Sequence, residues 1–209
     1  YEAVMDLGNY YYSRKNYDEA ISFYAMIDPT TLSDEQKSEI KFKQGYAQFF
    51  KKKYPEAKSS FGAIKNIKNK YYDQANYYYG LSCYYTDDFD NAVAAFKLLT
   101  QSKRYKSVVP AHICQILLAQ KKYDELIAFV EPLLGDSDIK KQPELRQMLG
   151  QAYFGKGDYE KALPYLEEYT ENSSKKTNED YFRLGVSQYK IKEYNKAVTN
   201  LKALEGDNS

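Results

Sequence analysis

The chain has 209 residues, with 30 Lys and Arg against 29 Asp and Glu, so its formal net charge is +1. This balance gives no bulk attraction to phosphate backbones and argues against a nucleic-acid partner. No apolar run approaches the roughly 18 residues that a membrane span needs. Two cysteines do not make a disulfide framework, so we expect Cys83 and Cys114 to be buried free thiols.

One pattern of small and aromatic residues recurs along the whole chain. Its small residue returns every 34 to 37 residues, at Gly8, Gly45, Gly80, Cys114, Gly150 and Gly185. A turn aromatic follows each one, at Tyr17, Tyr54, Phe89, Tyr123, Tyr159 and Tyr194. Three residues later stand Ala20, Ala57, Ala92, Leu126, Ala162 and Ala197, and four further on stand Tyr24, Phe61, Phe96, Val130, Leu166 and Leu201. This period predicts six helical hairpins whose last two columns are buried against a neighbour.

The pattern resembles the tetratricopeptide repeat family. The family signature, Leu-Gly-x-x-Tyr followed by Ala-x-x-x-Phe, is matched most fully by Leu7, Gly8, Tyr11, Ala20 and Tyr24. The Trp that the family favours in the first helix is replaced by other residues, among them Val4, Lys41 and Tyr181. The resemblance implies an all-α fold, a right-handed superhelical solenoid of antiparallel helical hairpins with the first helices lining the concave side.

We expect a single array over residues 1–209. Its repeats cover approximately residues 1–34, 35–70, 71–106, 107–139, 140–176 and 177–209. Repeat arrays need a polar cap, and after Leu204 only five residues remain to cover the last hairpin. Because the chain also begins at Tyr1 without Met, we expect it to be a fragment of a longer protein.

The first two hairpins have clear helix signals. We expect helices over residues 1–12 and 18–27, with Pro29 ending the second of them. Ser33 and Gln36 form a capping box that begins the next helix. Pro55 falls in the first turn of the following return helix, where its missing amide hydrogen costs nothing.

The middle of the array is less regular. The third hairpin opens at Tyr71 and turns at Asp87 and Asp88, whose carboxylates we expect to cap helices. The polar segment 101–107 is long enough to bend the array. The fourth hairpin begins near Pro110 with a shortened first helix and carries Pro132 inside the end of its second helix, where proline disrupts hydrogen bonding.

The fifth hairpin contains three glycines. We expect Gly155 and Gly157 to break its first helix, Asp158 to cap its second, and Thr177 to cap the first helix of the last hairpin. The run from Gly150 to Gly157 also resembles a phosphate-binding loop. However, Gly157 replaces the required Ser or Thr and no strand precedes the run, so we interpret it as structural.

Motifs of catalysis and metal binding are missing from the sequence. His112 is the single histidine, which we expect to be a partly exposed helix residue, and no HExxH, Gly-x-Ser-x-Gly or paired CxxC occurs. Asn172-Ser173-Ser174 is a glycosylation sequon in a polar loop, but such triplets often arise by chance. The sequence therefore predicts a protein that is not an enzyme and holds no metal or cofactor.

The 24 Tyr and 10 Phe exceed what the packing columns need, and the surplus concentrates in the first helices. Tyr supplies contact area at low entropy cost together with a hydroxyl group. We therefore predict that a partner segment binds in an aromatic-lined groove. Its candidate residues are Asn9, Tyr12, Phe42, Tyr46, Phe49, Phe50, Tyr77, Leu81, Tyr84 and Tyr85. Packing of these aromatics within the array is an equally weighted interpretation.

The sequence thus predicts a protein-interaction scaffold in a bacterial cytoplasm or periplasm, with a protein or peptide partner. The family's clamp for a chaperone C-terminal carboxylate uses basic and Asn side chains. Only Asn9 matches it here, because Met5, Phe42 and Tyr46 occupy the other inward positions. Two alternatives stay open: a regulatory region of a larger signalling or transcription protein, and a glycan or cell-wall binding module.

Overall fold

The computed structural model describes residues 2–139, 141–202 and 204, and this part of the chain contains helices and turns but no strand. The expectations about Tyr1 and about the cap formed by residues 205–209 lie outside the described residues. The chain divides into two compact units, Tyr1–Val109 and Pro110–Ser209. Each unit is described by itself below.

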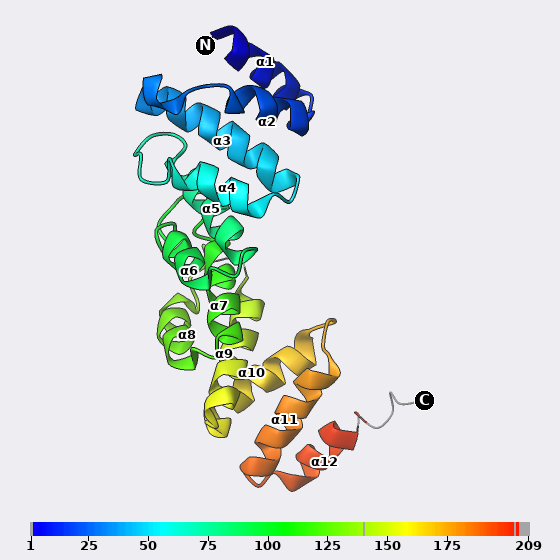
Figure 1. The fold of residues 1–209 in the computed structure, drawn as a ribbon. Helices are drawn as coiled ribbons and strands as arrows, with labels where there is room; N and C mark the ends of the chain where they lie inside the picture. The colour runs from blue at the N-terminus through cyan, green and yellow to red at the C-terminus, as the bar shows by residue number, and fades with distance from the viewer. Residues whose placement is uncertain (1, 140, 203, 205–209) are drawn as a thin grey trace. The chain divides into compact units, whose positions relative to one another are not determined.

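The first unit consists of three consecutive pairs of α-helices (Figure 1). They are α1 (Glu2–Ser13) and α2 (Tyr17–Ala25), α3 (Asp34–Phe50) and α4 (Tyr54–Gly62), and α5 (Tyr72–Tyr84) and α6 (Phe89–Lys97), with a 3-10 helix, η1 (Pro29–Thr31), after α2. Each α-helix packs against the next one, and the first helices α1, α3 and α5 also contact one another in sequence. This is the packing expected for stacked helical hairpins.

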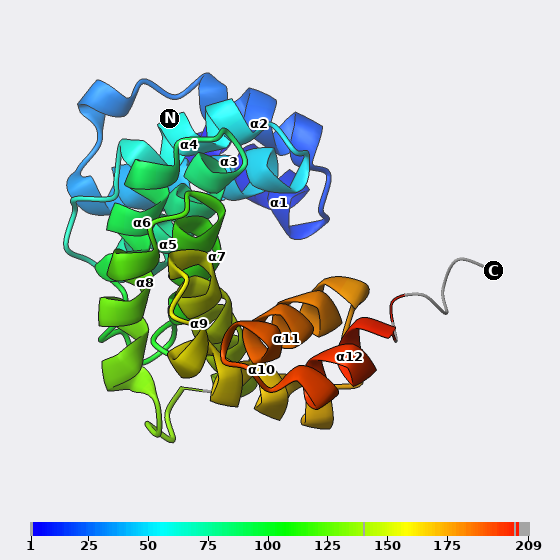
Figure 2. The same cartoon turned by 90° about the horizontal axis from the view of Figure 1, so that it is seen from below.

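The second unit continues the same order of helices. It contains α7 (Val109–Ala119), which begins at the boundary, α8 (Tyr123–Val130), η2 (Glu131–Leu133), α9 (Gln142–Lys156), α10 (Tyr159–Asn172), α11 (Asn178–Lys190) and α12 (Tyr194–Lys202). Each α-helix from α8 to α12 packs against the next, and α9 also contacts α11. Figure 1 shows α11 between α10 and α12, both of which it contacts. In Figure 2 the same unit is seen from below, with α12 beside α11.

The small-residue column makes room for a large side chain of the return helix. A Cβ atom added to Gly8 would lie 2.6 Å from the ring of Tyr24, and one added to Gly80 would lie 2.7 Å from the ring of Phe96. Both rings are buried. The predicted columns are thus in direct contact across each of these hairpins, and a larger first-helix residue would force the two helices apart.

Several local predictions are confirmed. Ser33 Oγ accepts a hydrogen bond from the backbone N of Gln36, whose side chain accepts one from the backbone N of Ser33. Thr177 caps α11 in the same way with Asp180. Asp158 accepts from the backbone N of Lys161 at the start of α10. Cys83 and Cys114 are free and buried, as expected.

Two predictions about proline differ in detail. Because α2 already ends at Ala25, Pro29 does not end that helix but begins the 3-10 helix η1. Likewise α8 ends at Val130, so Pro132 lies within the 3-10 helix η2 rather than inside the α-helix. Proline lacks the amide hydrogen that would continue the α-helical bonding, and the chain changes helix type before it.

Gly155 does not break a helix, contrary to the prediction. The helix α9 continues through Gly155 to Lys156 and ends at Gly157, which has a left-handed φ of 78°. A Cβ atom at Gly155 would overlap the ring of Tyr123 at the start of α8. Glycine is therefore required there for close packing, whereas Gly157 supplies the left-handed conformation that ends the helix.

The carboxylate of Asp88 does not cap α6, contrary to the prediction. It accepts hydrogen bonds from Lys58 Nζ at 2.5 Å and from Asn91 Nδ2 at 2.9 Å. The polar segment 101–107 is packed rather than loose. Within it, Tyr105 is only 7% exposed and Ser102 Oγ donates to Asp73 at 2.6 Å.

Candidate functional site

The turn ends of the first two hairpins are joined by aromatic contacts. The ring of Tyr12, near the end of α1, lies 6.0 Å from Tyr17 and 6.0 Å from Tyr46, measured between ring centroids. The ring of Phe50 lies 5.8 Å from Tyr17 and 4.5 Å from Tyr46. Four rings from three helices therefore form one connected set.

The connected set continues into the third hairpin. The ring of Phe49 lies 5.3 Å from Tyr54 and 5.9 Å from Tyr85. Tyr54 and Tyr85 stack on each other, and Tyr84 contacts both Tyr85 and Phe89. Since Phe49 also contacts Phe50, no break separates these rings from those of the preceding hairpins.

We call these nine side chains the aromatic surface: Tyr12, Tyr17, Tyr46, Phe49, Phe50, Tyr54, Tyr84, Tyr85 and Phe89. Three of its rings are largely open to solvent, with Phe50 52%, Tyr84 41% and Tyr85 52% exposed. These exposed fractions leave apolar area that a partner could still remove from water. The other members of the surface contact these exposed rings and restrict their motion. Binding therefore costs little additional side-chain entropy.

Two hydroxyl groups of the aromatic surface, those of Tyr12 and Tyr17, have a raised pKa. Burial raises the pKa of Tyr12 above its ordinary value, and the neighbouring Tyr46 adds to the effect. Burial raises the pKa of Tyr17 in the same direction. Both groups can therefore donate a hydrogen bond to a carbonyl or carboxylate oxygen of a ligand.

Six of the ten predicted site residues belong to the aromatic surface, and four lie elsewhere. Phe42 is only 9% exposed and lies in the core between Phe61 and Tyr71, with centroids 5.8 and 5.4 Å away. Tyr77 stacks on the buried ring of Tyr105, and Leu81 is partly buried in the last turn of α5. Phe42 therefore supports the fold from inside rather than presenting a free ring.

Asn9 is already engaged within the protein. Its Oδ1 accepts hydrogen bonds from Tyr24 Oη at 2.9 Å and from Lys43 Nζ at 2.8 Å. Lys43 also pairs with Glu39 at 2.6 Å. The carbonyl side of the Asn9 amide therefore bridges α1, α2 and α3, and only its amino group can serve a ligand.

Tyr17, Tyr54 and Phe89 are surface members that were not among the candidate residues. All three belong to the turn aromatic column, which the repeat pattern had already identified. This column is the signal that could have found them, because its members begin the return helices directly beside the exposed ends of the first helices. Lys43 was also missed, and nothing in the repeat columns marks it.

In the second unit, first-helix residues line a cavity of about 450 Å³. Its walls include Leu118 and Phe154 together with Gln115 and Gln151. These four residues come from the same sequence columns as Tyr12 and Asn9 of the first unit. These two columns thus line one cavity in the second unit, with aliphatic and amide side chains in place of most rings.

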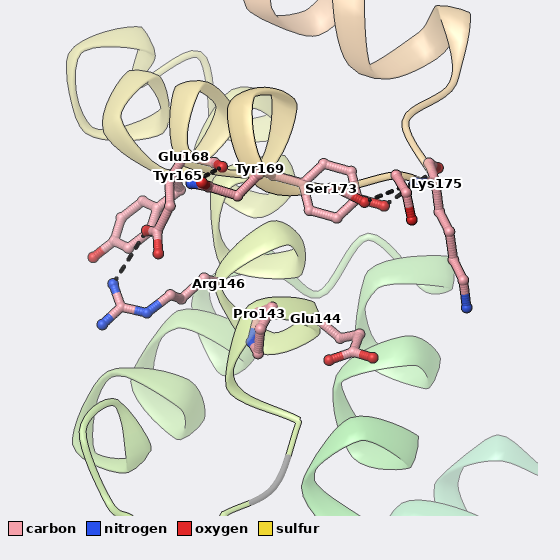
Figure 3. Close-up of a pocket in the computed structure, with 10 residues that line it drawn as sticks. Pro143, Glu144, Arg146, Tyr165, Glu168, Tyr169, Ser173 and Lys175 are labelled. Carbon is pink, nitrogen blue, oxygen red and sulfur yellow. Dashed lines mark hydrogen bonds and ion pairs between the residues drawn. The ribbon is translucent and has the colours of Figure 1, made fainter.

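A further cavity of about 410 Å³ lies between the start of α9, the second half of α10 and the loop after it (Figure 3). Arg146 points toward Glu168 and pairs with it at 3.4 Å, while Tyr169 Oη donates to the backbone O of Lys175. Asn172 of the sequon donates to the backbone O of Glu168. Arg146 and Glu168 therefore neutralise each other at this cavity. Two features of the sequence fall at this cavity: the sequon Asn172-Ser173-Ser174, and Arg146, which stands in the column where the family has Trp.

Among the described residues, no group of three or more His, Cys, Asp or Glu side chains could hold a metal ion. In the same part of the chain, no helix combines the length and apolarity required to cross a bilayer. His112 is partly buried in α7, and burial lowers its pKa below the ordinary value of 6.5.

Comparison with known proteins supports the interpretation of the repeats. Residues 119–204 match the sequence model of subunit 3 of the anaphase-promoting complex, or cyclosome. No curated protein matches the chain. The C-terminal part of a tetratricopeptide repeat-containing protein from Cytophaga hutchinsonii is similar in structure, with a TM-score of 0.69 at 16% identity, over 96% of this chain and 77% of that one.

Two further solved structures extend the comparison. MamA from Desulfovibrio magneticus RS-1, from residue 41 to its end, has a TM-score of 0.66 at 15% identity over 83% of this chain and 98% of that one. PilF from Pseudomonas aeruginosa has a TM-score of 0.60 at 16% identity over 99% of this chain and 92% of that one. The all-helical, tetratricopeptide-type fold that the repeat columns predict is therefore confirmed.

Proposed function

We propose that the protein is an interaction scaffold that binds a segment of a partner protein on the aromatic surface. Tetratricopeptide-type folds bind protein partners. The observation that carries the proposal is the connected set of nine rings over three hairpins, with Phe50, Tyr84 and Tyr85 exposed. Removing this apolar area from water drives binding, and tyrosine hydroxyl groups orient the segment.

The surface favours a ligand with apolar anchors. The exposed rings of Phe50, Tyr84 and Tyr85 can contact a partner's aliphatic or aromatic side chains, and aromatic residues are enriched in the centre of protein interfaces. A single well-buried anchor of this kind contributes about 2 kcal/mol or more. In this proposal Phe42 supports the surface from inside through its contact with Tyr46, and the amino group of Asn9 remains available to a ligand.

The test is capture of partners by the protein and by a variant with Phe50→Ala, Tyr84→Ala and Tyr85→Ala. A matched control variant removes three exposed rings of the second unit, Phe182→Ala, Tyr189→Ala and Tyr194→Ala, which are 44%, 57% and 53% exposed. We expect a partner that the parent and the control retain and the first variant loses. Circular dichroism checks that all three proteins are equally helical.

A photo-crosslinking amino acid in place of Tyr84 then identifies what touches the surface. Crosslinks to one segment of the captured protein support the proposal. Equal capture by all three proteins, or crosslinks only to isolated cell-wall glycan offered in parallel, contradicts it. The second of these results would favour the glycan-binding alternative.

A further inference from the structure

A second surface of the first unit is strongly basic. It is formed by the two segments that join successive hairpins, residues 63–71 between α4 and α5 and residues 98–108 between α6 and α7. From residue 58 to 72 the chain has four Lys and no acidic residue, and from residue 91 to 109 it has four Lys or Arg and again no acidic residue. In a chain with a net charge of +1, this segregation gives one region a local excess of positive charge.

The basic segments border a cavity of about 490 Å³. We call it the basic cavity, and the residues of its wall that matter here are Lys68, Lys70, Tyr72, Asp73 and Arg104. The single carboxylate among them, Asp73, accepts a hydrogen bond from Ser102 Oγ at 2.6 Å. This bond ties the second basic segment to α5.

The walls of the basic cavity are held in place by other hydrogen bonds. Asn69 Nδ2 donates to Ser38 Oγ at 2.9 Å, and Asn69 Oδ1 accepts from the backbone N of Tyr71. Asn76 Nδ2 donates to the backbone O of Lys65 at 2.8 Å. These bonds fix the first segment against α3 and α5, so the cations on it start from an ordered backbone.

Two cations of the cavity lie on tyrosine rings. Lys68 Nζ is 3.4 Å from the ring centroid of Tyr72, and the guanidinium of Arg104 is 5.6 Å from that of Tyr105. Tyr105 is itself fixed, since it stacks on Tyr77 with centroids 4.4 Å apart. A ring holds a cation from one side and leaves its other N–H groups available for an anion.

Neither Lys68 nor Arg104 has a carboxylate partner in the part of the chain that the structure describes. Lys70 pairs with Glu35 at 3.1 Å, but both side chains are more than half exposed. An exposed pair of this kind contributes little and exchanges readily for another anion. Three cations at one cavity are therefore available to a ligand without the loss of a strong internal pair.

We propose that the basic cavity binds an acidic segment of a partner protein, whose Asp or Glu carboxylates pair with Lys68 and Arg104. The site is distinct from the aromatic surface, because it is built from the segments between hairpins and not from the turns within them. Charge complementarity selects an anion. A cavity of this volume accommodates a few side chains of an extended peptide.

The same geometry disfavours two other polyanions. Lys68 lies over one face of the ring of Tyr72, so a nucleic-acid base could stack on that face only by displacing the cation. The cavity is lined by three cations, whereas basic segments that bind anionic membranes commonly carry about four to eight Lys or Arg. A peptide can place successive carboxylates against these cations.

The experiment measures the fluorescence anisotropy of labelled poly-glutamate peptide with the full chain, and of poly-glutamine as the neutral counterpart. We expect binding of the acidic peptide alone, which weakens as salt rises. The variant Lys68→Gln, Arg104→Gln weakens binding by about tenfold or more, because both charge-assisted pairs are lost. The control Lys190→Gln, Lys202→Gln removes the same charge from exposed helix positions of the second unit and leaves the affinity within about twofold of the parent, because long-range charge effects are screened by salt.

Three results would overturn the proposal. One is equal affinity for the acidic and neutral peptides. A second is unchanged binding by the Lys68 and Arg104 variant while its helicity equals that of the parent. The third is tighter binding of phosphatidylserine vesicles, an oligodeoxythymidine or inorganic phosphate with the same dependence on Lys68 and Arg104, which would assign the cavity to that anion. Because none of these probes depends on Phe50, Tyr84 or Tyr85, failure here leaves the aromatic surface untouched.

Discussion

Tyr54, the first residue of α4, and Tyr85, which follows α5, stack with ring centroids 4.4 Å apart and an interplanar angle of 14°. The two rings join the second and third hairpins at the aromatic surface. Tyr85 is 52% exposed although it is stacked on one face. The contact therefore stabilises the array and at the same time leaves much of the Tyr85 ring exposed to a partner.

We predict that Tyr54 and Tyr85 are energetically coupled. In a double-mutant cycle with Tyr54→Ala and Tyr85→Ala, the coupling should be about 0.5 to 1.5 kcal/mol, as for other stacked aromatic pairs. The measurement is urea unfolding followed by circular dichroism. As a control, Tyr54→Ala combined with Tyr194→Ala should show additive effects, since the two residues belong to different units. Additivity in the first cycle would contradict the prediction.

We predict that Gly80 tolerates no side chain, whereas Gly62 does. Gly80→Ala places a Cβ 2.7 Å from Phe96, and should lower the free energy of unfolding by about 1 to 3 kcal/mol through overpacking. At Gly62 the nearest atom to an added Cβ is 3.4 Å away. Gly62→Ala should therefore raise the free energy of unfolding by up to about 1 kcal/mol through helix propensity.

The control for Gly80 is a second substitution that makes room. Gly80→Ala combined with Phe96→Leu should recover part of the loss relative to the sum of the single variants, because the smaller side chain no longer meets the new methyl group. Full additivity of the two losses in urea unfolding would show that the contact between Gly80 and Phe96 does not limit the packing.

The contact between Gly80 and Phe96 was predictable from the sequence, because both columns repeat with the period of the hairpin and a small residue must face each large one. The role of Gly155 was not predictable in this way. Gly155, two residues before Gly157, was predicted from the local sequence to break the helix. Glycine is required there because the ring of Tyr123, more than thirty residues earlier in the chain, leaves no room for a side chain. Spacing within one hairpin carries no signal of a contact with the preceding hairpin.

In the candidate site, too, some features could be predicted from the sequence and others could not. Phe49 and Phe50 could be assigned to the exposed ends of first helices because their column recurs in each repeat. Phe42 could not be separated from them, since burial at that position depends on the rings of Phe61 and Tyr71 from two other helices. For the basic cavity, the sequence shows only stretches with basic and no acidic residues. Its contacts between cations and rings could not be predicted, because they depend on side-chain geometry.

We predict that the turn lysine Lys52 carries backbone strain. Its φ is 58°, in the left-handed region, and Lys15, Asp87, Lys121 and Lys192 hold the same turn position in other hairpins. A non-glycine residue in this conformation costs about 1 to 2 kcal/mol, and glycine loses part of that gain through its freedom in the unfolded chain. Lys52→Gly should therefore raise the free energy of unfolding by about 0.5 to 1 kcal/mol.

Two matched variants test the origin of this gain. Gly157→Lys introduces the strain into the fifth hairpin, where φ is 78°, and should lower the free energy of unfolding by about 1 kcal/mol. Lys51→Gly should also lower it, because φ is −81° at Lys51 and glycine relieves nothing there. A stabilising effect of Lys51→Gly as large as that of Lys52→Gly would assign the gain to charge rather than to backbone conformation.

We predict that the ion pair of Lys58 and Asp88 makes stability depend on pH below about 4, near the ordinary pKa of an aspartate. The hydrogen bond from Lys58 lowers the pKa of Asp88 below its ordinary value of 3.8, and Asn91 adds to the effect. A carboxylate whose pKa is lower in the folded than in the unfolded protein stabilises the fold at pH values above its unfolded pKa. This stabilisation is lost as the pH falls through the pKa of the folded state. Asp88→Asn should therefore lower the free energy of unfolding at pH 7 by about 1 kcal/mol, and lower it less at pH 3. Urea unfolding at both pH values measures the difference.

The control Asp6→Asn removes an exposed carboxylate that has no ion pair among the described residues, and should change the free energy of unfolding little at either pH. An equal loss at pH 7 and pH 3 for Asp88→Asn would mean that the carboxylate acts through packing and not through its charge.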